Sequence, residues 1–224
     1  MGFSDRSDAG RRLAVALEGL AGRRPVIVAL PRGGVPVAFE VSRALGAPLE
    51  ILAVRKLGAP GNPEVGVGAL AEDGTVVFDP ESAGRLGMTE ETLESTLALE
   101  SRELLRRVER YRDGRAPIAV SGRTVIIVDD GLATGLTDLA AVRTLRKRGA
   151  GAIIVAVPVG SSEAVSMLAK EADRIVCLEV PPRLFGVGMW YEDFRPVSDE
   201  EVVALLATQR RSMPPSATTC EPVM

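Results

Sequence analysis

Two adjacent aspartates stand between a strand-like run and a loop of small residues, where they could do chemistry on a bound ligand. Asp129 and Asp130 follow the apolar residues 125–128, and residues 131–137 lead from them into a helical pattern. In open α/β sheets, ligands bind beyond the carboxyl ends of the strands, and a helix N-terminus presents amide N–H groups to anions. Glycines let such a loop approach a phosphate closely, and threonines donate hydroxyl hydrogen bonds to it. The loop is therefore predicted to bind a phosphate group.

The two carboxylates restrict the kind of phosphate ester that the loop would bind. Two anions beside a phosphate site repel the ligand unless they contact something else, such as sugar hydroxyls or a metal ion. A Walker loop requires a lysine where this sequence has Leu136, and the G-x-G-x-x-G dinucleotide fingerprint is absent. A phosphorylated sugar would offer a phosphate group to the loop and hydroxyl groups to the two carboxylates.

Composition excludes several kinds of catalysis. The 224 residues include no histidine, which removes histidine general bases, Ser-His-Asp triads and zinc sites that need imidazole. The two cysteines, Cys177 and Cys220, lie far apart and form no C-x-x-C motif, so neither a disulfide framework nor a redox site is indicated. Carboxylates, hydroxyls, lysine, arginine or an added metal ion remain.

Charge and hydropathy restrict the partners. The 27 basic and 30 acidic side chains give a net charge of −3, so neither nucleic acid nor an anionic membrane is expected as a partner. The N-terminus is polar and lacks the apolar core of a signal peptide. The apolar run at residues 152–159 is far shorter than the roughly 20 residues that cross a bilayer. We expect a soluble, cytoplasmic protein.

Short β-branched runs alternate with helical patterns, which predicts an α/β fold with a doubly wound, mainly parallel sheet. We expect a single domain over residues 1–207 and a disordered tail at 208–224. The charged helix at 89–112 is interpreted as a lid or oligomer contact, or as an ordinary surface helix, and we expect a homo-oligomer. The expected helices are at about 8–20, 37–45, 89–112, 136–148, 162–170 and 198–206, and the strands at 26–30, 49–54, 65–70, 75–78, 124–128, 152–157 and 174–178.

The stretch VIIVDDGLATGLT resembles the signature with which type I phosphoribosyltransferases bind phosphoribosyl pyrophosphate (PRPP): a hydrophobic strand, two acids and a small-residue loop with Thr-Gly. The loop at residues 30–34 resembles the pyrophosphate loop of that family, and Arg55-Lys56 is similar to adenine phosphoribosyltransferases. The resemblance covers about residues 8–180. The stretch FGVGMWYEDF resembles a less characterised bacterial branch whose acceptor is not identified.

The resemblance implies roles for individual residues. Asp129 and Asp130 would be catalytic and would hold the ribose hydroxyls. The loop at 30–34 would give amide groups to the pyrophosphate, with the non-proline cis peptide common in this fold, and basic side chains would balance the leaving group. Alternatively, the basic residues are solvated and Gly-Gly is only a turn. The implied PRPP-binding residues are Arg32, Gly33, Gly34, Arg55, Lys56, Asp129, Asp130, Gly131, Leu132, Ala133, Thr134, Gly135 and Thr137.

The implied activity is that of a phosphoribosyltransferase, in which a nucleobase or another nitrogen acceptor displaces pyrophosphate from C1 of PRPP. Mg²⁺ is the implied cofactor, bound mainly through PRPP. Ala133 replaces the aspartate that serves enzymes of 6-oxopurines as general base, so hypoxanthine and guanine are disfavoured, and Glu64 or Glu72 are candidate bases. The alternatives are a catalytically silent PRPP sensor or regulatory protein, and a flavodoxin-like domain that binds another phosphoester.

The resemblance also implies a small C-terminal hood over the acceptor, with elements at about residues 1–20 and 180–200. Four of the eight aromatic residues lie in the second of these stretches, residues 180–200. They would stack on a flat acceptor, or alternatively form a satellite core beneath a long loop. These residues are Phe185, Trp190, Tyr191 and Phe194.

Overall fold

A parallel sheet of five strands forms the centre of the computed structural model, which describes residues 2–59 and 62–212. The strands run in the order β2-β1-β6-β7-β8, and every neighbouring pair is parallel. The sheet confirms the predicted α/β class. Its strands are β1 (Val26–Ala29), β2 (Leu49–Ile51), β6 (Thr124–Val128), β7 (Ala152–Val159) and β8 (Arg174–Glu179).

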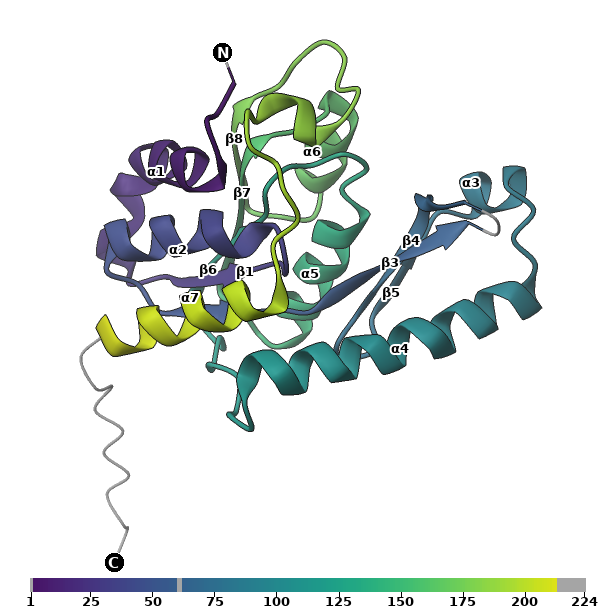
Figure 1. Ribbon diagram of the computed structural model, residues 1–224, viewed down its shortest axis with the longest axis horizontal. Helices are drawn as coiled ribbons and strands as arrows, with labels where there is room; N and C mark the ends of the chain where they lie inside the picture. The colour runs from purple at the N-terminus through teal and green to yellow at the C-terminus, as the bar shows by residue number, and fades with distance from the viewer. Residues whose placement is uncertain (1, 60–61, 213–224) are drawn as a thin grey trace, which may run out of the picture.

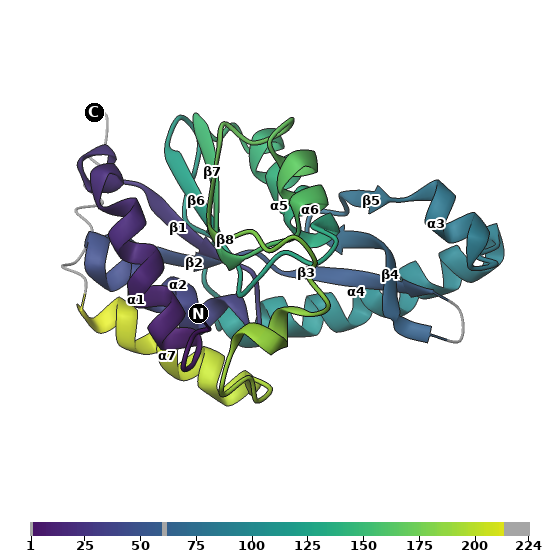
Figure 2. The same cartoon turned by 90° about the horizontal axis from the view of Figure 1, so that it is seen from above.

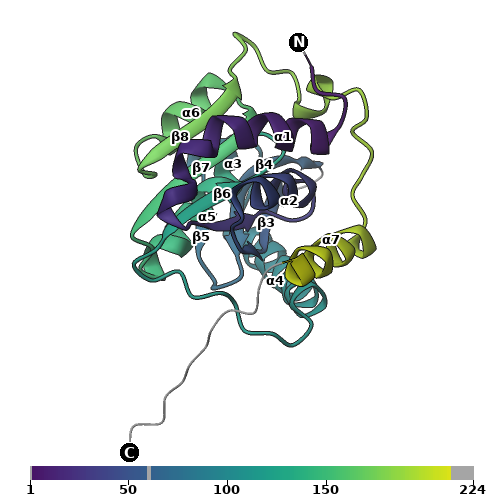
Figure 3. The same cartoon turned by 90° about the vertical axis from the view of Figure 1, so that its left-hand side faces the viewer.

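Helices cover both faces of this sheet because its side chains alternate between two apolar clusters. Ile27 and Ile126 face the cluster that α1 and α2 complete, whereas Val28 and Ile127 face the cluster that α5 and α6 complete. Figure 3 shows α1 and α2 side by side. These helices are α1 (Arg6–Leu17), followed by the 3₁₀ helix η1 (Glu18–Arg23), α2 (Gly34–Leu45), α5 (Leu136–Lys147) and α6 (Ser162–Leu168).

An antiparallel three-stranded sheet and two helices form an arm that extends from one end of the central sheet (Figure 1). Seen from above, helix α4 runs along this arm (Figure 2). α4 has 23 residues, but neither it nor any other helix of the described residues is long and apolar enough to cross a bilayer. The arm contains β3 (Val54–Ala59), β4 (Asn62–Ala71), β5 (Val76–Phe78), α3 (Pro80–Arg85) and α4 (Glu90–Arg112).

Buried ion pairs join the arm to the central sheet. The guanidinium of Arg112 donates to Glu72 at 2.7 Å and to Glu50 at 3.4 Å, and Glu72 also accepts from Arg148 at 2.8 Å. The other oxygen of Glu72 accepts from the Ala53 amide at 3.0 Å, so both oxygens of this buried carboxylate are used in contacts within the fold. Glu72 therefore stabilises the fold and is not placed to act as a base, while the side chain of Glu64, the other candidate, lies outside the described residues.

The expected strand at residues 49–54 is two strands that belong to different sheets. The amide of Leu52 donates to Ala29 at 3.0 Å and ends the pairing of β2 with β1, and the next amide, of Ala53, donates to the Glu72 carboxylate at 3.0 Å. The chain then enters the arm as β3. This side-chain capture separates the strands, and nothing in the run of apolar residues indicates it.

Helix α7 (Asp199–Ser212) is longer than the sequence predicts. It packs against α2 and α4 through the buried side chains of Val202 and Leu206. Residues 208–212, which the sequence assigned to the disordered tail, are helical, and residues 213–224 lie outside the described part. A short 3₁₀ helix, η2 (Val187–Trp190), precedes α7 in the chain.

Candidate active site

The loop that follows β6 is anchored at its centre by Leu132. The amide of Leu132 donates to Val159 at 2.9 Å, and its carbonyl accepts from the amide of Ser161 at 2.9 Å. The Leu132 side chain is fully buried. The sequence placed Leu132 among the phosphate-binding residues, but its amide is already used, so it fixes the loop to β7 and leaves the following residues to face a ligand.

Lys56 reaches the same loop from the arm. A cavity of about 140 Å³ is lined by Lys56 and by the N-terminal end of α5. Among the described residues, the amides of Thr134 and Gly135 donate no hydrogen bond to the chain. A cationic side chain, free amides and the positive end of a helix dipole all favour an anion. The cavity residues are Lys56, Gly68, Gly131, Ala133, Thr134, Gly135, Leu136, Thr137 and Asp138.

Arg55 and Lys56 point to opposite sides of β3, because successive side chains alternate along a strand. Lys56 lies across Gly66 of β4, where a Cβ atom would come within 2.6 Å of Lys56 Cε. Arg55 points to α4 and forms an ion pair with Glu100 at 2.5 Å. Of the two basic side chains that the sequence assigns to the pyrophosphate, Arg55 thus attaches α4 to the arm, and Lys56 lies beside the loop before α5.

The loop after β1 lies against the acidic pair. A Cβ atom on Gly33 would stand 1.9 Å from Asp130 Oδ2, and one on Gly34 would stand 2.9 Å from the Cα of Asp129. The peptide between Pro31 and Arg32 is cis, as the resemblance implied. The Gly34 amide donates to the carbonyl of residue 30 at 3.1 Å. The amides of Arg32 and Gly33, by contrast, donate to no other residue in the described part of the chain and remain available to a ligand.

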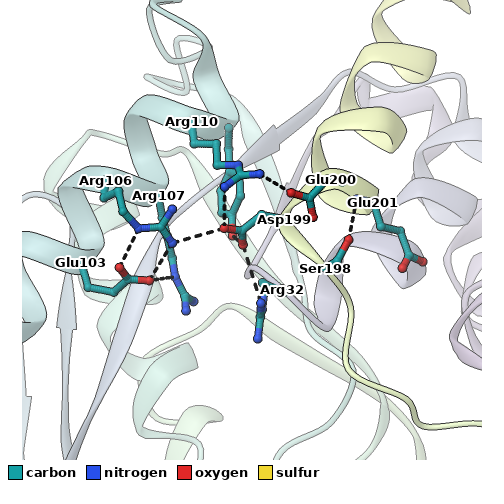
Figure 4. A network of polar contacts seen from close by, with 10 residues as sticks. Arg32, Glu103, Arg106, Arg107, Arg110, Ser198, Asp199, Glu200 and Glu201 are labelled. Atoms are coloured by element: carbon teal, nitrogen blue, oxygen red, sulfur yellow. Dashed lines mark hydrogen bonds and ion pairs between the residues drawn. The ribbon is translucent and has the colours of Figure 1, made fainter.

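The side chain of Arg32 reaches a cluster of charges between α4 and α7 (Figure 4). Its guanidinium lies 3.7 Å from Asp199, which also contacts Arg106 at 3.2 Å and accepts from the Tyr111 hydroxyl at 2.6 Å. Although partial burial acts in the opposite direction, the Tyr111 hydrogen bond and the arginines lower the pKa of Asp199. At the site, Arg32 thus offers its backbone amide.

Asp129 and Asp130 share a buried environment that disfavours two negative charges. Burial raises the pKa of both carboxyls, and at Asp129 the charges of Asp130 and Asp138 raise it further. At Asp130, an ion pair with Arg6 opposes this rise. When two carboxyls interact in one buried site, one of them keeps its proton to a higher pH than an isolated carboxyl would. The second negative charge is therefore favoured by the arrival of a cation or hydrogen-bond donor.

Asp138 is a third acid of the site, which the sequence did not single out. Its side chain is 1% exposed; Oδ2 accepts from the Thr137 hydroxyl at 3.3 Å, and Oδ1 has no partner among the described residues. Burial raises the pKa of Asp138 to about 7. Acids are common in the first turn of a helix, where the dipole favours them, so residue type and position alone do not mark this one as buried.

Replacing Asp138 by asparagine is expected to change the pH dependence of stability. A pKa near 7 in the folded state, against 3.8 in the unfolded chain, means that the carboxyl destabilises the fold increasingly as pH rises from about 4 to 7. Melting temperatures at pH 5 and pH 8 should show Asp138→Asn gaining several degrees on the wild type at the higher pH. In the control Asp173→Asn, the melting temperature should fall below that of the wild type by about the same amount at pH 5 and pH 8, because the Ile153 amide lowers the pKa of the Asp173 carboxyl and it is ionised at both pH values.

The chain at the start of α1 and the loop between β8 and α7 pack together, and we call them the hood region, after the hood predicted at about residues 1–20 and 180–200. Phe3 pairs with Tyr191 in a β-bridge, and its ring lies 5.4 Å from the Tyr191 ring. Tyr191 is 7% exposed, and its hydroxyl donates to the Asp130 carbonyl at 2.6 Å. Tyr191 is thus part of a small satellite core that supports the acidic pair, which corrects its assignment to the acceptor surface. Phe185 is 80% exposed and Trp190 is half-buried, so these two remain candidates for an acceptor contact.

The sequence of this site and its surroundings matches a known family. Residues 6–192 match the family described as "Phosphoribosyl transferase domain". The chain belongs to the phosphoribosyl transferase family. The match includes both loops and the acidic pair, and it begins at Arg6, within the N-terminal segment of the hood region.

Three known proteins are similar to this member of the phosphoribosyl transferase family over most of its length. Two proteins from Mycobacterium tuberculosis strains, both provisionally named phosphoribosyl transferases, are 46% identical over 209 residues, which is 93% of this chain. The chain spans about half the length of these relatives, 47%. The crystal structure of TT1426 from Thermus thermophilus is 45% identical and covers 93% of this chain and 99% of that one, with a TM-score of 0.77.

Proposed function

We propose that the protein transfers the 5-phosphoribosyl group of PRPP to a nitrogen acceptor, such as a nucleobase, and releases pyrophosphate. The observation that carries the proposal is the contact between the Gly33 loop and the acidic pair, beside the cavity that Lys56 shares with the loop before α5. Three parts of one ligand need three neighbouring sites. The loop before α5 would bind the phosphate, and the acidic pair would bind the ribose hydroxyls. The loop after β1, with its free amides, would bind the pyrophosphate.

The 5′-phosphate fits the cavity at the N-terminus of α5. The amides of Thr134 and Gly135 and the hydroxyl of Thr137 would donate to its oxygens, with Lys56 supplying positive charge. Asp129 and Asp130 would then accept from the ribose hydroxyls. The amides of Arg32 and Gly33 would receive the pyrophosphate, because Gly33 lies directly against Asp130.

The residues present fit magnesium that enters with PRPP. The described residues contain no group of three or more acidic or cysteine side chains that could cage an ion, and two carboxylates stand at the end of β6. Mg²⁺ is held in many phosphate-handling sites by one or two carboxylates together with phosphate oxygens. When bound, the ion would neutralise charge on the departing pyrophosphate. Asp129 and Asp130 would hold it on the protein side and stabilise positive charge on the ribose.

The acceptor would enter beneath the loop that carries Phe185 and Trp190. Ala133 offers no side chain that could remove a proton from a 6-oxopurine, and Glu72 is held in its buried ion pairs. An acceptor that needs no carboxylate base from these positions is favoured. A PRPP-binding regulatory protein remains the second candidate, because neither of these positions in the described part of the chain supplies such a base.

Pyrophosphate release in the presence of Mg-PRPP tests the proposal. We expect release that depends on both magnesium and one member of a panel of bases and amines, and little release with hypoxanthine or guanine. Matched reactions with ribose 5-phosphate in place of PRPP control for contaminating phosphatases. Binding of PRPP without release for any acceptor would favour the regulatory protein, and absence of both would contradict the proposal.

A further inference from the structure

Asp199 is the acid at the centre of the cluster of charges between α4 and α7 (Figure 4). It is the first residue of α7, and its side chain is 12% exposed. Its Oδ1 accepts from the Tyr111 hydroxyl at 2.6 Å, and its Oδ2 lies 3.2 Å from Arg106 and 3.4 Å from Arg110. Three side chains of α4 therefore hold both oxygens of this carboxylate in place.

The packing of α7 against α2 brings Asp199 next to the loop at 31–34. The side chain of Val197, just before α7, is 5% exposed and belongs to the same apolar cluster as Val35 in the first turn of α2. Val202, in the first turn of α7, is buried in this cluster too. Because α2 begins where the loop ends, this packing sets the distance between the loop and the first residue of α7.

The side chain of Arg32 is the part of the loop that reaches Asp199. Its Nη1 lies 3.7 Å from Asp199 Oδ1, and this side chain makes no other ion pair or hydrogen bond within the described part of the chain. The backbone of the loop is bonded to itself: the Val35 amide donates to the Arg32 carbonyl, and the Gly34 amide donates to the Leu30 carbonyl, each at 3.1 Å. The ion pair thus links a small closed loop to α7.

The charge of Asp199 is what keeps the Arg32 side chain at this place. Glu103 and Glu200 are further partners of the two α4 arginines that contact Asp199, and neither of them pairs with Arg32. Without the Asp199 charge, the Arg32 guanidinium would face those two cations, and like charges repel. Because the Arg32 side chain is 39% exposed, it would then turn into water and release the loop.

We infer that Asp199 is a positioning residue, which holds the loop at 31–34 through Arg32 so that the amides of Arg32 and Gly33 face the pyrophosphate of the substrate. The inference rests on the proposed function for the identity of the ligand, whereas the contact that holds the loop is present without any ligand. A loop that is already fixed loses less conformational entropy when it binds a ligand, so its affinity for that ligand is higher.

Amide hydrogen exchange of the ligand-free protein tests the contact that holds the loop. The amides of Gly34 and Val35 are protected by the bonds within the loop, so their exchange rates report how often it opens. In Asp199→Asn these rates should rise by about fivefold, the upper range for the loss of a partly exposed ion pair. An asparagine oxygen can still accept from the Tyr111 hydroxyl, so the junction of α4 and α7 is kept.

Calorimetric titrations with Mg-pyrophosphate and with ribose 5-phosphate, the two parts of the substrate, test the effect on the ligand. Asp199→Asn should weaken Mg-pyrophosphate binding about fivefold and change ribose 5-phosphate binding by less than about twofold. Since Asp199 acts through Arg32, the same replacement should have no further effect on binding in Arg32→Gln. A general loss of structure would instead weaken the binding of both ligands and add to the effect of Arg32→Gln.

The matched control is Glu200→Gln, at the next residue of α7. Glu200 pairs with Arg110 and not with Arg32, so exchange rates and both affinities should stay at the wild-type values. Unchanged exchange in Asp199→Asn, equal weakening of both ligands, or full additivity with Arg32→Gln would overturn the inference. If the wild type binds neither ligand while Asp199→Asn still speeds exchange in the loop, the proposed function fails and the contact that holds the loop stands.

Discussion

Replacing both Asp129 and Asp130 by asparagine is expected to lower PRPP turnover by about 1,000-fold or more while the protein remains folded. The loss is large because both groups act where positive charge develops on the ribose, and interactions made in a buried site contribute most to the barrier. An asparagine oxygen can still accept from Arg6, so the hood region keeps its contact. Pyrophosphate release measures the loss, and circular dichroism with a melting curve confirms the fold.

The matched control for this double variant is Glu163→Gln with Glu171→Gln. These acids are exposed on and after α6, neither of them lines the cavity at the N-terminal end of α5, and Glu171 also has an arginine partner, Arg143, at 2.7 Å. The control should keep wild-type turnover. If the aspartate variant retained turnover within a few-fold of the wild type, the acidic pair would not be the ribose site.

Gly33→Ala is expected to reduce the affinity for Mg-PRPP by about 100-fold or more. The backbone angles of Gly33, φ −60° and ψ −35°, suit any residue, so the effect does not arise from backbone strain. The added methyl would stand 1.9 Å from Asp130 Oδ2, so either the carboxylate or the loop must move. Both bind the ligand in our account. Calorimetric titration with Mg-PRPP measures the affinity.

Gly84→Ala is the matched control for Gly33→Ala. Gly84 lies in α3, where a Cβ atom would meet nothing within 4 Å. Alanine there should leave Mg-PRPP affinity unchanged and, as a better helix former, raise stability slightly. An unaltered affinity in Gly33→Ala would show that the loop at 31–34 does not take part in binding.

The parts of the site that lie close together in sequence could be predicted from it. Asp129, Asp130 and the glycines around them form a continuous pattern, because one strand, one loop and one helix end build the phosphate site. The sequence also indicated Arg55 together with Lys56, but β3 sends adjacent side chains to opposite faces, and only Lys56 lines the cavity. Leu132 was selected with its neighbours, although its backbone is used to fix the loop.

The parts that depend on long-range contacts could not be predicted. Arg6 and Asp130 are 124 residues apart in the chain, and their contact requires the hood region to be assembled. Tyr191 looked like an acceptor contact because its neighbours are aromatic, but it is buried against Phe3. Asp138 is an ordinary helix-start acid in sequence, and its burial depends on how β6, α5 and the arm come together.

The most direct test of the PRPP site is a calorimetric titration of the wild-type protein with PRPP, with and without magnesium. Our account predicts one site per chain that requires magnesium for full affinity, and competition by pyrophosphate and by ribose 5-phosphate, since each occupies one part of the site. The same titration of the Asp129→Asn/Asp130→Asn variant should show little or no heat. Absence of binding by the wild type at millimolar Mg-PRPP, or equal binding by the variant, would contradict the account.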